Sequence, residues 1–525
     1  MHIARHLLGA AVATLALSAA TARAQDISIA LQTDATSMDP HVAPTFTTSA
    51  LHQHVFDTLI AVDPRLATGP DLATSWRAVN ETTWEFELRQ GVTFSDGTPF
   101  TAEDVAFSIA RVQSVRHGAG TYAPYARPIS AVTVLGPHRV RLETATPYPQ
   151  LPLDVSRLRI VSAAAARDAS TADFNQGRAA IGTGPYRLVR WTPGDRLELT
   201  RNPTYWGQAP AWANVTFRPI SNDAARLAAL LSNTVDLIDK VPMNDVARLR
   251  SDARIAIFQH DGNRTMFLVP DTAREVSPFV TDRQGKPLDP NPLRDVRVRQ
   301  ALSLAINRPA LTERAMEGQA SPANQAAPEG MFGFTPNLPA TTYDPAAARR
   351  LLAEAGYPQG FRMVLHCSNG RYVNDRQTCL AVAQMLTRIG VEASAEAEPQ
   401  TVFMTRMTAF NASLMLNGWG SYGDNLIVLR QSVHSVDPSR GYGGFNRGRY
   451  ANAEVDRLIE TAAATFDDRA REILQQQAME AAIRDGAVIP LYTAAWIWAA
   501  RRGIAFTPGF DEGTLAMRAI PVAQQ

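Results

Sequence analysis

Segments of alternating polar and apolar residues interleave with capped helices along the whole chain, and no repeat period relates them. Trp84, Phe86 and Leu88 alternate with charged residues, which is typical of a half-buried strand. Thr101, followed three residues later by Asp104, resembles a capping box and predicts a helix that begins there. Strands and helices that alternate in this way favour an α/β or mixed fold.

Two helices in the second half of the chain are marked by their ends. Asp344 precedes a proline and Gly356 follows the last residue with a helical pattern, so we expect a helix between them. A longer helix is expected from Asp467 to Gly486. In contrast, the proline-rich residues 276–292 predict a surface excursion or an inserted arm.

Length and charge limit the function classes. At the usual size of about 150 residues per domain, 525 residues correspond to roughly three globular units. The 51 Lys and Arg residues nearly balance the 50 Asp and Glu residues. Such a balance provides no electrostatic footprint for nucleic acid or for an anionic membrane surface, so we expect no nucleic-acid partner.

The N-terminus resembles a secretory signal peptide. A short basic segment precedes the apolar residues 7–20, and an Ala-Arg-Ala sequence ends at Ala24, so cleavage would remove residues 1–24. No cysteine stands near this cleavage position to carry a lipid, and no later stretch approaches about 20 apolar residues. We expect an exported, periplasmic protein without a lipid anchor.

The two cysteines of the chain, Cys367 and Cys379, are twelve residues apart on either side of a polar segment. In an oxidising compartment two nearby cysteines are more often bridged than free or metal-bound. We expect a disulfide, which would contribute on the order of 3 kcal/mol to stability. Two buried thiols are the alternative.

The sequence lacks the motifs of common catalytic and cofactor sites. It contains no phosphate-binding loop, H-E-x-x-H helix, paired C-x-x-C or G-x-S-x-G elbow. Residues 182–184 lack the third glycine of a dinucleotide fingerprint. His52 and His54 are two residues apart, which is the wrong spacing for a shared metal on one helix. We therefore expect neither cofactor nor metal and predict that the protein is not an enzyme, while a triad of Ser, His and Asp, which has no fixed spacing in a sequence, stays open as an alternative.

Five ordered segments, residues 70–112, 179–210, 294–308, 343–358 and 488–492, carry motifs of one family. They include SDGTPFTAEDVAFSI, GTGPYRLVRW and YDPAAARRLLAEAGYP. These motifs resemble the extracytoplasmic solute-binding proteins of the peptide/nickel class (family 5, with oligopeptide- and dipeptide-binding members), which serve ABC importers. The resemblance implies an α/β, two-lobed periplasmic-binding-protein clamshell of type II, with an additional domain inserted into the first lobe.

The resemblance also implies a division of the chain. Lobe I is expected to comprise residues 25–56, 179–263 and 490–525, the inserted domain residues 57–178, and lobe II residues 264–489. The chain would cross between the lobes near residues 263–271 and 490–495, which places Asn263 and Arg264 at the first hinge.

A tryptophan-containing loop is the first candidate for the ligand site. In peptide-binding members of the family, an aspartate three residues after the tryptophan pairs with the ligand's α-ammonium. Here Trp419 aligns, but Tyr422 stands in place of that aspartate. A buried ammonium without a carboxylate partner costs several kcal/mol. Either Asp424 replaces the aspartate, or the ligand has no free amino terminus there. Ser421 completes this set of candidates, and plain packing is the alternative role for the two aromatic residues.

Other candidates follow from position. Arg371 and Tyr372 lie between the cysteines, where the guanidinium suits a ligand carboxylate or, alternatively, remains solvated. Two further groups are Thr33, Asp34, Met38 and Asp39 after the first strand, and Tyr122 and Tyr125 in the inserted domain.

The resemblance implies a receptor that captures peptides or peptide-like solutes by lobe closure and delivers them to ABC permease subunits in the inner membrane, as a monomer. A non-peptide solute such as an opine, glycoside or metal chelate is the alternative ligand. A secreted hydrolase or a chaperone on the same fold is a less favoured alternative.

Overall fold

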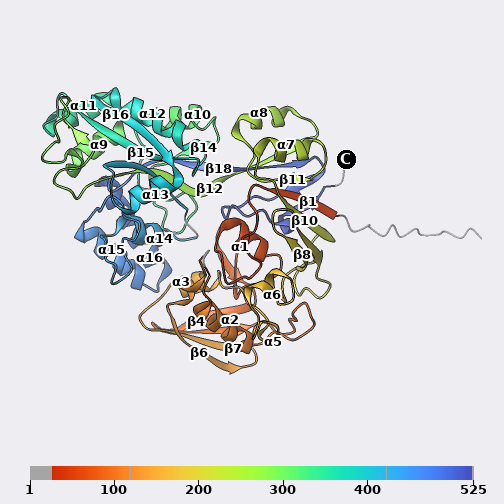
Figure 1. Ribbon diagram of the computed structural model, residues 1–525. Coiled ribbons are helices and arrows are strands. Elements are labelled where there is room, and N and C mark those ends of the chain that lie inside the picture. The colour runs from red at the N-terminus through yellow and green to blue at the C-terminus, as the bar shows by residue number, and fades with distance from the viewer. Residues whose placement is uncertain (1–25, 118–119, 421–422, 523–525) are drawn as a thin grey trace, which may run out of the picture.

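One twelve-stranded sheet extends through both lobes of the molecule (Figure 1). The computed structural model describes residues 26–117, 120–420 and 423–522, so the predicted signal peptide lies outside the described residues. The strands of lobe I are β1 (Asp26–Leu31), β8 (Tyr186–Thr192), β9 (Arg196–Arg201), β10 (Asn214–Pro219) and β11 (Leu237–Ile238). Those of lobe II are β13 (Val280–Thr281), β14 (Ala320–Pro322), β15 (Phe361–Asn369), β16 (Val391–Pro399) and β17 (Leu414–Gly420).

Two long neighbouring strands, β12 (Ile255–Pro270) and β18 (Ile489–Arg501), belong to both lobes and connect them (Figure 1). They pair antiparallel along almost their whole length, and the register shifts between Asp261 and Thr265. The predicted hinge residues Asn263 and Arg264 lie in this irregular stretch. The connection between the lobes is therefore a single hydrogen-bonded ribbon.

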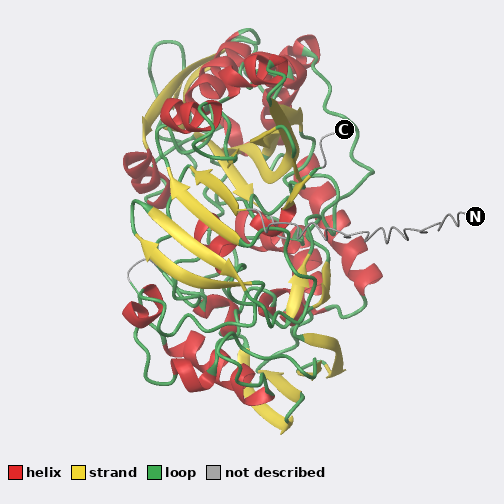
Figure 2. Cartoon of the chain, turned by 90° about the vertical axis from the view of Figure 1, so that its right-hand side faces the viewer, coloured by secondary structure: helices red, strands yellow, loops and turns green. Residues whose placement is uncertain are grey.

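Helices cover the sheet in both lobes. In lobe I they are α1 (Phe46–His52), α7 (Asp223–Leu231) and α8 (Met243–Ser251), and α6 (Thr171–Asn175), which the sequence assigns to the inserted domain, packs against the lobe I core through Phe174. In lobe II they are α9 (Val296–Leu304), α10 (Arg308–Arg314), α11 (Pro345–Glu354), α12 (Asp375–Thr387), α13 (Gln400–Thr408), α14 (Leu426–Val428), α15 (Ala453–Ala464) and α16 (Asp468–Arg484). Seen from the side, the molecule is elongated, and helices gather at its upper end (Figure 2).

A separate antiparallel sheet lies below the two lobes in Figure 1, with strand order β4–β5–β7–β6. Its elements are β4 (Ala73–Asn80), β5 (Thr83–Leu88), β6 (Ile129–Gly136) and β7 (Arg139–Thr144), with the helices α2 (Ala102–Ser114), α3 (Ala123–Ala126), α4 (Leu151–Val155) and α5 (Ala163–Ala166) nearby. Phe86, Phe94 and Phe100 belong to a core of its own. The pairs β2 (Ile60–Val62) with β3 (Thr68–Pro70), and β19 (Ile504–Phe506) with β20 (Ala519–Pro521), complete the strands. We call the unit built on this separate sheet the lower domain.

Several local predictions are confirmed. The strand at residues 84–88 is β5, and the capping box of Thr101 and Asp104 begins α2. The side chain of Asp344 caps α11, and Gly356, with φ of 94°, follows its end. Asp467 likewise caps α16, which ends at Arg484.

The proline-rich residues 276–292 are built into the fold more closely than expected. They contain β13, which pairs with β15, and Val280 is fully buried in the lobe II core. The segment is thus in part an edge strand, because Val280, the apolar residue of β13, packs into the core beneath the sheet.

The disulfide predicted between Cys367 and Cys379 is present, with the Cα atoms 6.6 Å apart. Cys367 lies on β15 and Cys379 on α12, and both are fully buried. The bond therefore joins a strand to the helix that packs on it, and it encloses the loop that carries Arg371.

Candidate ligand-binding site

A cavity of about 980 Å³ lies between lobe I, lobe II and the lower domain. This is near the upper end of the range for small-molecule sites, about 300–1,000 Å³. Its walls come from residues 44–71, 122–159, 185–211, 404–420, 445–447 and 511–520, together with Arg264 and Arg371. A ligand that fills this cavity contacts both lobes at once.

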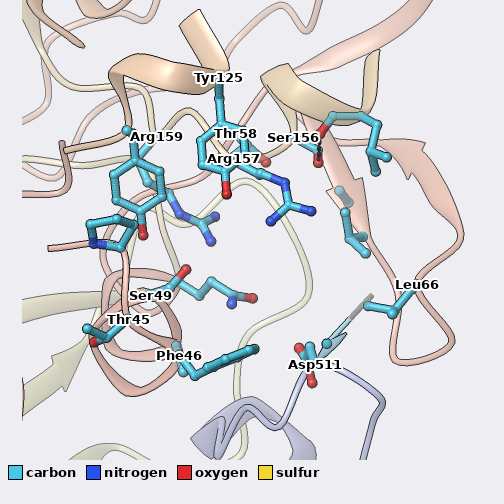
Figure 3. Close-up of a pocket in the computed structure, with 18 of the residues that line it drawn as sticks. Thr45, Phe46, Ser49, Thr58, Leu66, Tyr125, Ser156, Arg157, Arg159 and Asp511 are labelled. Carbon is cyan, nitrogen blue, oxygen red and sulfur yellow. Dashed lines mark hydrogen bonds between the residues drawn. The ribbon is translucent and has the colours of Figure 1, made fainter. Parts of the chain in front are cut away.

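Helix α1 provides the wall on the lobe I side. Thr45 caps the helix, because its side chain accepts a hydrogen bond from the backbone N–H of Thr48. Phe46 and Ser49 of this helix face the cavity, and Tyr125 of α3 lies opposite them (Figure 3). This wall combines an aromatic face with hydroxyl groups, a combination that suits a partly polar organic ligand.

Two carboxyl groups and a guanidinium, those of Asp57, Asp71 and Arg159, form the end of the cavity next to the lower domain, where Asp57 is buried and the other two are half-buried. Oδ2 of Asp57 accepts a hydrogen bond from Nε1 of Trp206 at 2.9 Å, and Oδ2 of Asp71 accepts one from the backbone N–H of Thr58 at 3.0 Å. Burial raises the pKa of both carboxyl groups, that of Asp71 to about 7, and the neighbouring Asp57 contributes to the latter shift. The charge of Arg159, directed into the cavity in Figure 3, opposes both shifts. The environment thus disfavours the charged form of both carboxyl groups.

The wall on the lobe II side is aromatic and cationic. Trp419, at the end of β17, meets Phe445 edge-on with ring centroids 5.3 Å apart. Met404 of α13 adds an apolar surface, and Arg371 and Arg447 bring two guanidinium groups to the same wall. Such a wall can stack on planar or apolar groups and donate hydrogen bonds to anionic ones.

A smaller cavity of about 320 Å³ adjoins the larger one beside the connecting strands. Both cavities share Phe46, Arg264 and Arg371, and Tyr372 lines the smaller one. Oε1 of Glu512 lies 3.6 Å from Nη2 of Arg264 in its wall. Burial raises the pKa of Glu512 to about 7, although the charge of Arg264 acts against this shift.

Six of the candidates predicted from the sequence line these cavities. Five line the larger one, namely Trp419, Arg371, Arg264, Tyr122 and Tyr125, and Tyr372 lines the smaller one. Asn263 is fully buried beside Arg264, and its side-chain amide has no hydrogen-bond partner among the described residues. Ser421 and Tyr422 lie outside the described residues.

The candidates after the first strand lie in lobe I, and the lining of neither cavity includes them. They are Thr33, Asp34, Met38 and Asp39. Asp39 is fully buried and pairs with Arg111 at 2.7 Å, and Met38 belongs to the lobe I core. Asp34 accepts a hydrogen bond from the backbone N–H of Gly194 at 2.6 Å. The structure does not bring this group together with the tryptophan of lobe II.

Asp424 is buried inside lobe II, and neither cavity lining includes it. Its Oδ1 accepts a hydrogen bond from the backbone N–H of Leu426 at 2.7 Å. Burial raises the pKa of Asp424 to about 6, while this hydrogen bond and the charge of Arg471 lower it. The carboxyl group therefore stabilises the local turn at Leu426 and lines neither cavity.

Sequence reasoning missed Phe46, Arg157, Arg159 and Arg447, all of which line the cavity. No motif marks them, because their proximity arises only when distant stretches of chain meet. A weak signal exists for Arg447 alone, which lies in the glycine-rich stretch GYGGFNRG of residues 441–448.

The described residues contain neither a cluster of metal-binding side chains nor a helix that could cross a membrane. Within them, no group of three or more His, Cys, Asp and Glu side chains is placed to hold a metal ion. Nor is any helix there of sufficient length and apolar character for a bilayer crossing.

Two lobes joined by a pair of strands, with a ligand-sized cavity between them, define a two-lobed solute-binding protein. Comparison with known proteins agrees with this class. Residues 67–438 match the model of the bacterial extracellular solute-binding proteins, family 5 Middle. The chain belongs to this family.

Relatives of known identity cover nearly the whole chain. It is 26% identical over 497 residues to the glutathione-binding protein GsiB of Escherichia coli O157:H7, which covers 92% of each chain. Its fold is similar to that of the unliganded open form of the periplasmic murein tripeptide binding protein MppA, with a TM-score of 0.80, 21% identity and coverage of 96% and 98%. It is also similar to AgaA of A. tumefaciens R10 in complex with agropinic acid, with a TM-score of 0.72, 22% identity and coverage of 95% and 99%.

Proposed function

We propose that this protein is the periplasmic substrate-binding component of an ABC importer and captures a peptide or peptide-like solute between its lobes. The observation that carries the proposal is the cavity whose opposite walls belong to different lobes, beside the strands that connect them. Family membership and the relatives that bind glutathione and a murein tripeptide support a peptide-like ligand.

The proposed cycle needs no chemical reaction. A ligand stabilises the closed state only through contacts that it makes better there than in the open state. Here Phe46 and Trp419 provide aromatic surfaces from opposite lobes, and rotation about the connecting strands would bring them onto one ligand. Closure expels water, which strengthens the polar contacts in the cavity.

We further propose which predicted residues contact the ligand. Trp419, Arg371 and Tyr372 are favoured because they line the cavities. Of the two alternatives for the missing family aspartate, the position of Asp424 supports a ligand without a free amino terminus next to Trp419.

The remaining predictions on the chain complete the proposal. They are export with removal of residues 1–24, the absence of a lipid anchor, a monomeric state, delivery to inner-membrane permease subunits, and the domain boundaries given above. Intact mass of protein from the periplasm tests the first two, because a retained leader or a lipid changes the mass. Light scattering after gel filtration tests the monomer.

Binding is tested by isothermal titration of the mature protein with a library of di- to pentapeptides, together with small-angle X-ray scattering. We expect at least one member to bind with a micromolar or lower Kd, which corresponds to about −8 kcal/mol, and to reduce the radius of gyration. Trp419→Ala should weaken this binding at least tenfold, whereas Trp76→Ala, in the lower domain and outside the cavity lining, should not. Failure of every peptide to bind would contradict the proposed ligand class.

The hydrolase alternative is tested with the same samples. After prolonged incubation, mass spectrometry should recover the bound peptide unchanged. A cleavage product whose formation stops in a cavity variant would favour the hydrolase instead.

A further inference from the structure

Two guanidinium groups of the lobe II wall, those of Arg371 and Arg447, face the same cavity without an acidic partner. Among the described residues neither group forms an ion pair, whereas the neighbouring Arg264 and Arg406 pair with Glu512 and Glu398. This wall of the cavity therefore carries positive charge that the protein itself leaves uncompensated.

The contacts of the two side chains are apolar instead. The Cζ atom of Arg447 lies 5.3 Å from the ring centre of Phe445 and 5.8 Å from that of Phe410. The Cζ atom of Arg371 lies 5.0 Å from the ring centre of Tyr372, and its Nη1 contacts Sδ of Met404. Such cation–π contacts do not use up the N–H groups of a guanidinium, so both side chains can still donate hydrogen bonds to a ligand.

The two cations also disfavour each other. Burial lowers the pKa of Arg447, and the positive charge of Arg371 lowers it further. In addition, Nε of Arg447 is buried and has no hydrogen-bond partner among the described residues. Like charges in a partly buried wall are costly unless an anion lies between them.

The opposite walls do not supply that anion. Asp57 and Asp71 line the end of the cavity next to the lower domain, beside Arg159, and burial there raises the pKa of both carboxyl groups. Asp511 lines the cavity but is engaged by Arg518 through two hydrogen bonds of 2.7 Å. Arg157, which follows α4 of the lower domain, adds another guanidinium to the cavity lining (Figure 3).

We propose that Arg371 and Arg447 together hold a carboxylate of the ligand, and that the protein thereby selects acidic solutes, peptides or peptide-like acids with more carboxylates than amines. This inference rests on the proposed function and narrows its ligand class. A carboxylate can accept two parallel N–H bonds from one guanidinium and further bonds from a second. Arg447, which no sequence motif marks, becomes a determinant of specificity.

The test uses isothermal titration of the mature protein with four named probes at low and at high salt. The four probes are reduced glutathione, its diethyl ester, triglutamate and trialanine. A fifth compound, trilysine, serves as the cationic comparison. We expect glutathione or triglutamate to bind most tightly, and esterification or replacement by alanine to weaken binding at least tenfold. Arg447→Gln should weaken the acidic probe about 10- to 100-fold, because a charge-assisted hydrogen-bonding group is lost, and Arg447→Lys should recover part of this loss.

Arg449→Gln is the matched control. Arg449 is two residues away, exposed, and its Cζ atom lies 4.0 Å from the ring centre of Phe410, but it does not line the cavity. This variant should bind like the wild type. Thermal unfolding of each variant without probe shows whether it is folded, and the ester comparison needs no variant at all.

The outcomes separate the two proposals. If trialanine or another neutral peptide binds as tightly as the acidic probes, or if Arg447→Gln leaves acidic binding unchanged, the acidic selectivity is wrong while the receptor function stands. If no peptide binds, and mass spectrometry of protein from its own periplasm finds no retained solute, both proposals fail. A retained solute without an acidic group also overturns the inference.

Discussion

The carboxyl group of Asp424 lies inside lobe II, with a raised pKa of about 6 and a hydrogen bond from the backbone of Leu426. Because the folded-state pKa lies above the unfolded value, the folded protein holds more protons between about pH 4 and 6. The ionised carboxylate therefore costs stability above this range, and the cost disappears as the pH falls through it.

Asp424→Asn tests this view of the residue. As the pH rises from 4 to 8, the wild type should lose about 2 kcal/mol of unfolding free energy relative to the variant, because only the wild type must bury a charge at this position. Its affinity for the ligand should stay within twofold. The measurement is urea unfolding at both pH values, with titration of whichever peptide binds. A loss of affinity confined to ligands with a free amino group would instead return Asp424 to the site.

At the residue scale, the sequence predicted part of the site and only a part. Trp419 was identified from the family's tryptophan-containing loop and Arg371 from its position between the two cysteines, and both line the cavity. Asp39 was misleading as a cavity candidate, since its position after a strand is equally suited to the buried ion pair with Arg111 that it forms. A ligand role for it remains only a prediction. Arg447 escaped notice because its place in the wall depends on tertiary packing.

At the scale of elements, the connecting strands leave no room for a side chain at Gly262. A Cβ atom added there would lie 2.6 Å from the backbone oxygen of Ala494 and 2.3 Å from Nε1 of Trp496. Because one of these atoms is backbone, the two strands themselves would have to separate.

Gly262→Ala should therefore destabilise the protein by about 1–3 kcal/mol and alter the distribution between open and closed forms. Urea unfolding measures the first effect, and small-angle scattering with and without ligand measures the second. Gly136→Ala is the control, because Gly136 also lies in a strand but has no atom within 4 Å of an added Cβ. Equal effects of both variants would show that the contact at the crossing has no special weight.

The disulfide joins β15 to α12 around the loop that carries Arg371. The loop has a second support, because the carboxylate of Asp375 accepts hydrogen bonds from the backbone N–H groups of Gly370, Arg371 and Tyr372 at 3.0 to 3.1 Å. Stability and loop geometry thus depend on different groups.

Replacing Cys367 and Cys379 by alanine should lower the unfolding free energy by about 3 kcal/mol, mainly because the unfolded chain regains freedom. Ligand affinity should change less than threefold, since Asp375 still positions the loop. Chemical unfolding and titration are the measurements, and a reductant should affect the wild type but not the double variant. A large loss of affinity would show that the bond also shapes the site.

Elements with local signals were predictable from the sequence. The ends of α2, α11 and α16 follow from caps, and β5 follows from alternation, because these patterns act over a few residues. The short edge strand β13 was not predicted, since its pairing with β15 depends on a partner about 80 residues away in the chain.

At the scale of the whole molecule, buried groups with opposite pKa shifts influence the pH dependence of stability. His41, His52 and His54 in lobe I have their pKa values lowered to about 4 by burial. The unfolded chain binds protons at these positions below about pH 6.5, so they cause stability to fall on acidification. Glu512, with a raised pKa of about 7, acts in the opposite direction.

Glu512→Gln should remove this opposing contribution. When the pH falls from 7 to 5, the unfolding free energy changes in both proteins. The change in the variant should be less favourable than the change in the wild type by about 2 kcal/mol. Urea unfolding of both proteins at the two pH values provides the comparison. Parallel pH profiles would contradict the assigned shift of Glu512.

Both passages of the chain between the lobes run side by side in a ladder of hydrogen bonds that is irregular between Asp261 and Thr265. Torsion in one strand is therefore shared by the other, and sliding of one lobe past its neighbour would break the ladder. We therefore expect the lobes to move relative to each other mainly by rotation about these two strands. A membrane complex that inspects the outer surface would consequently meet a one-parameter series of shapes, in which one angle reports whether the protein is loaded.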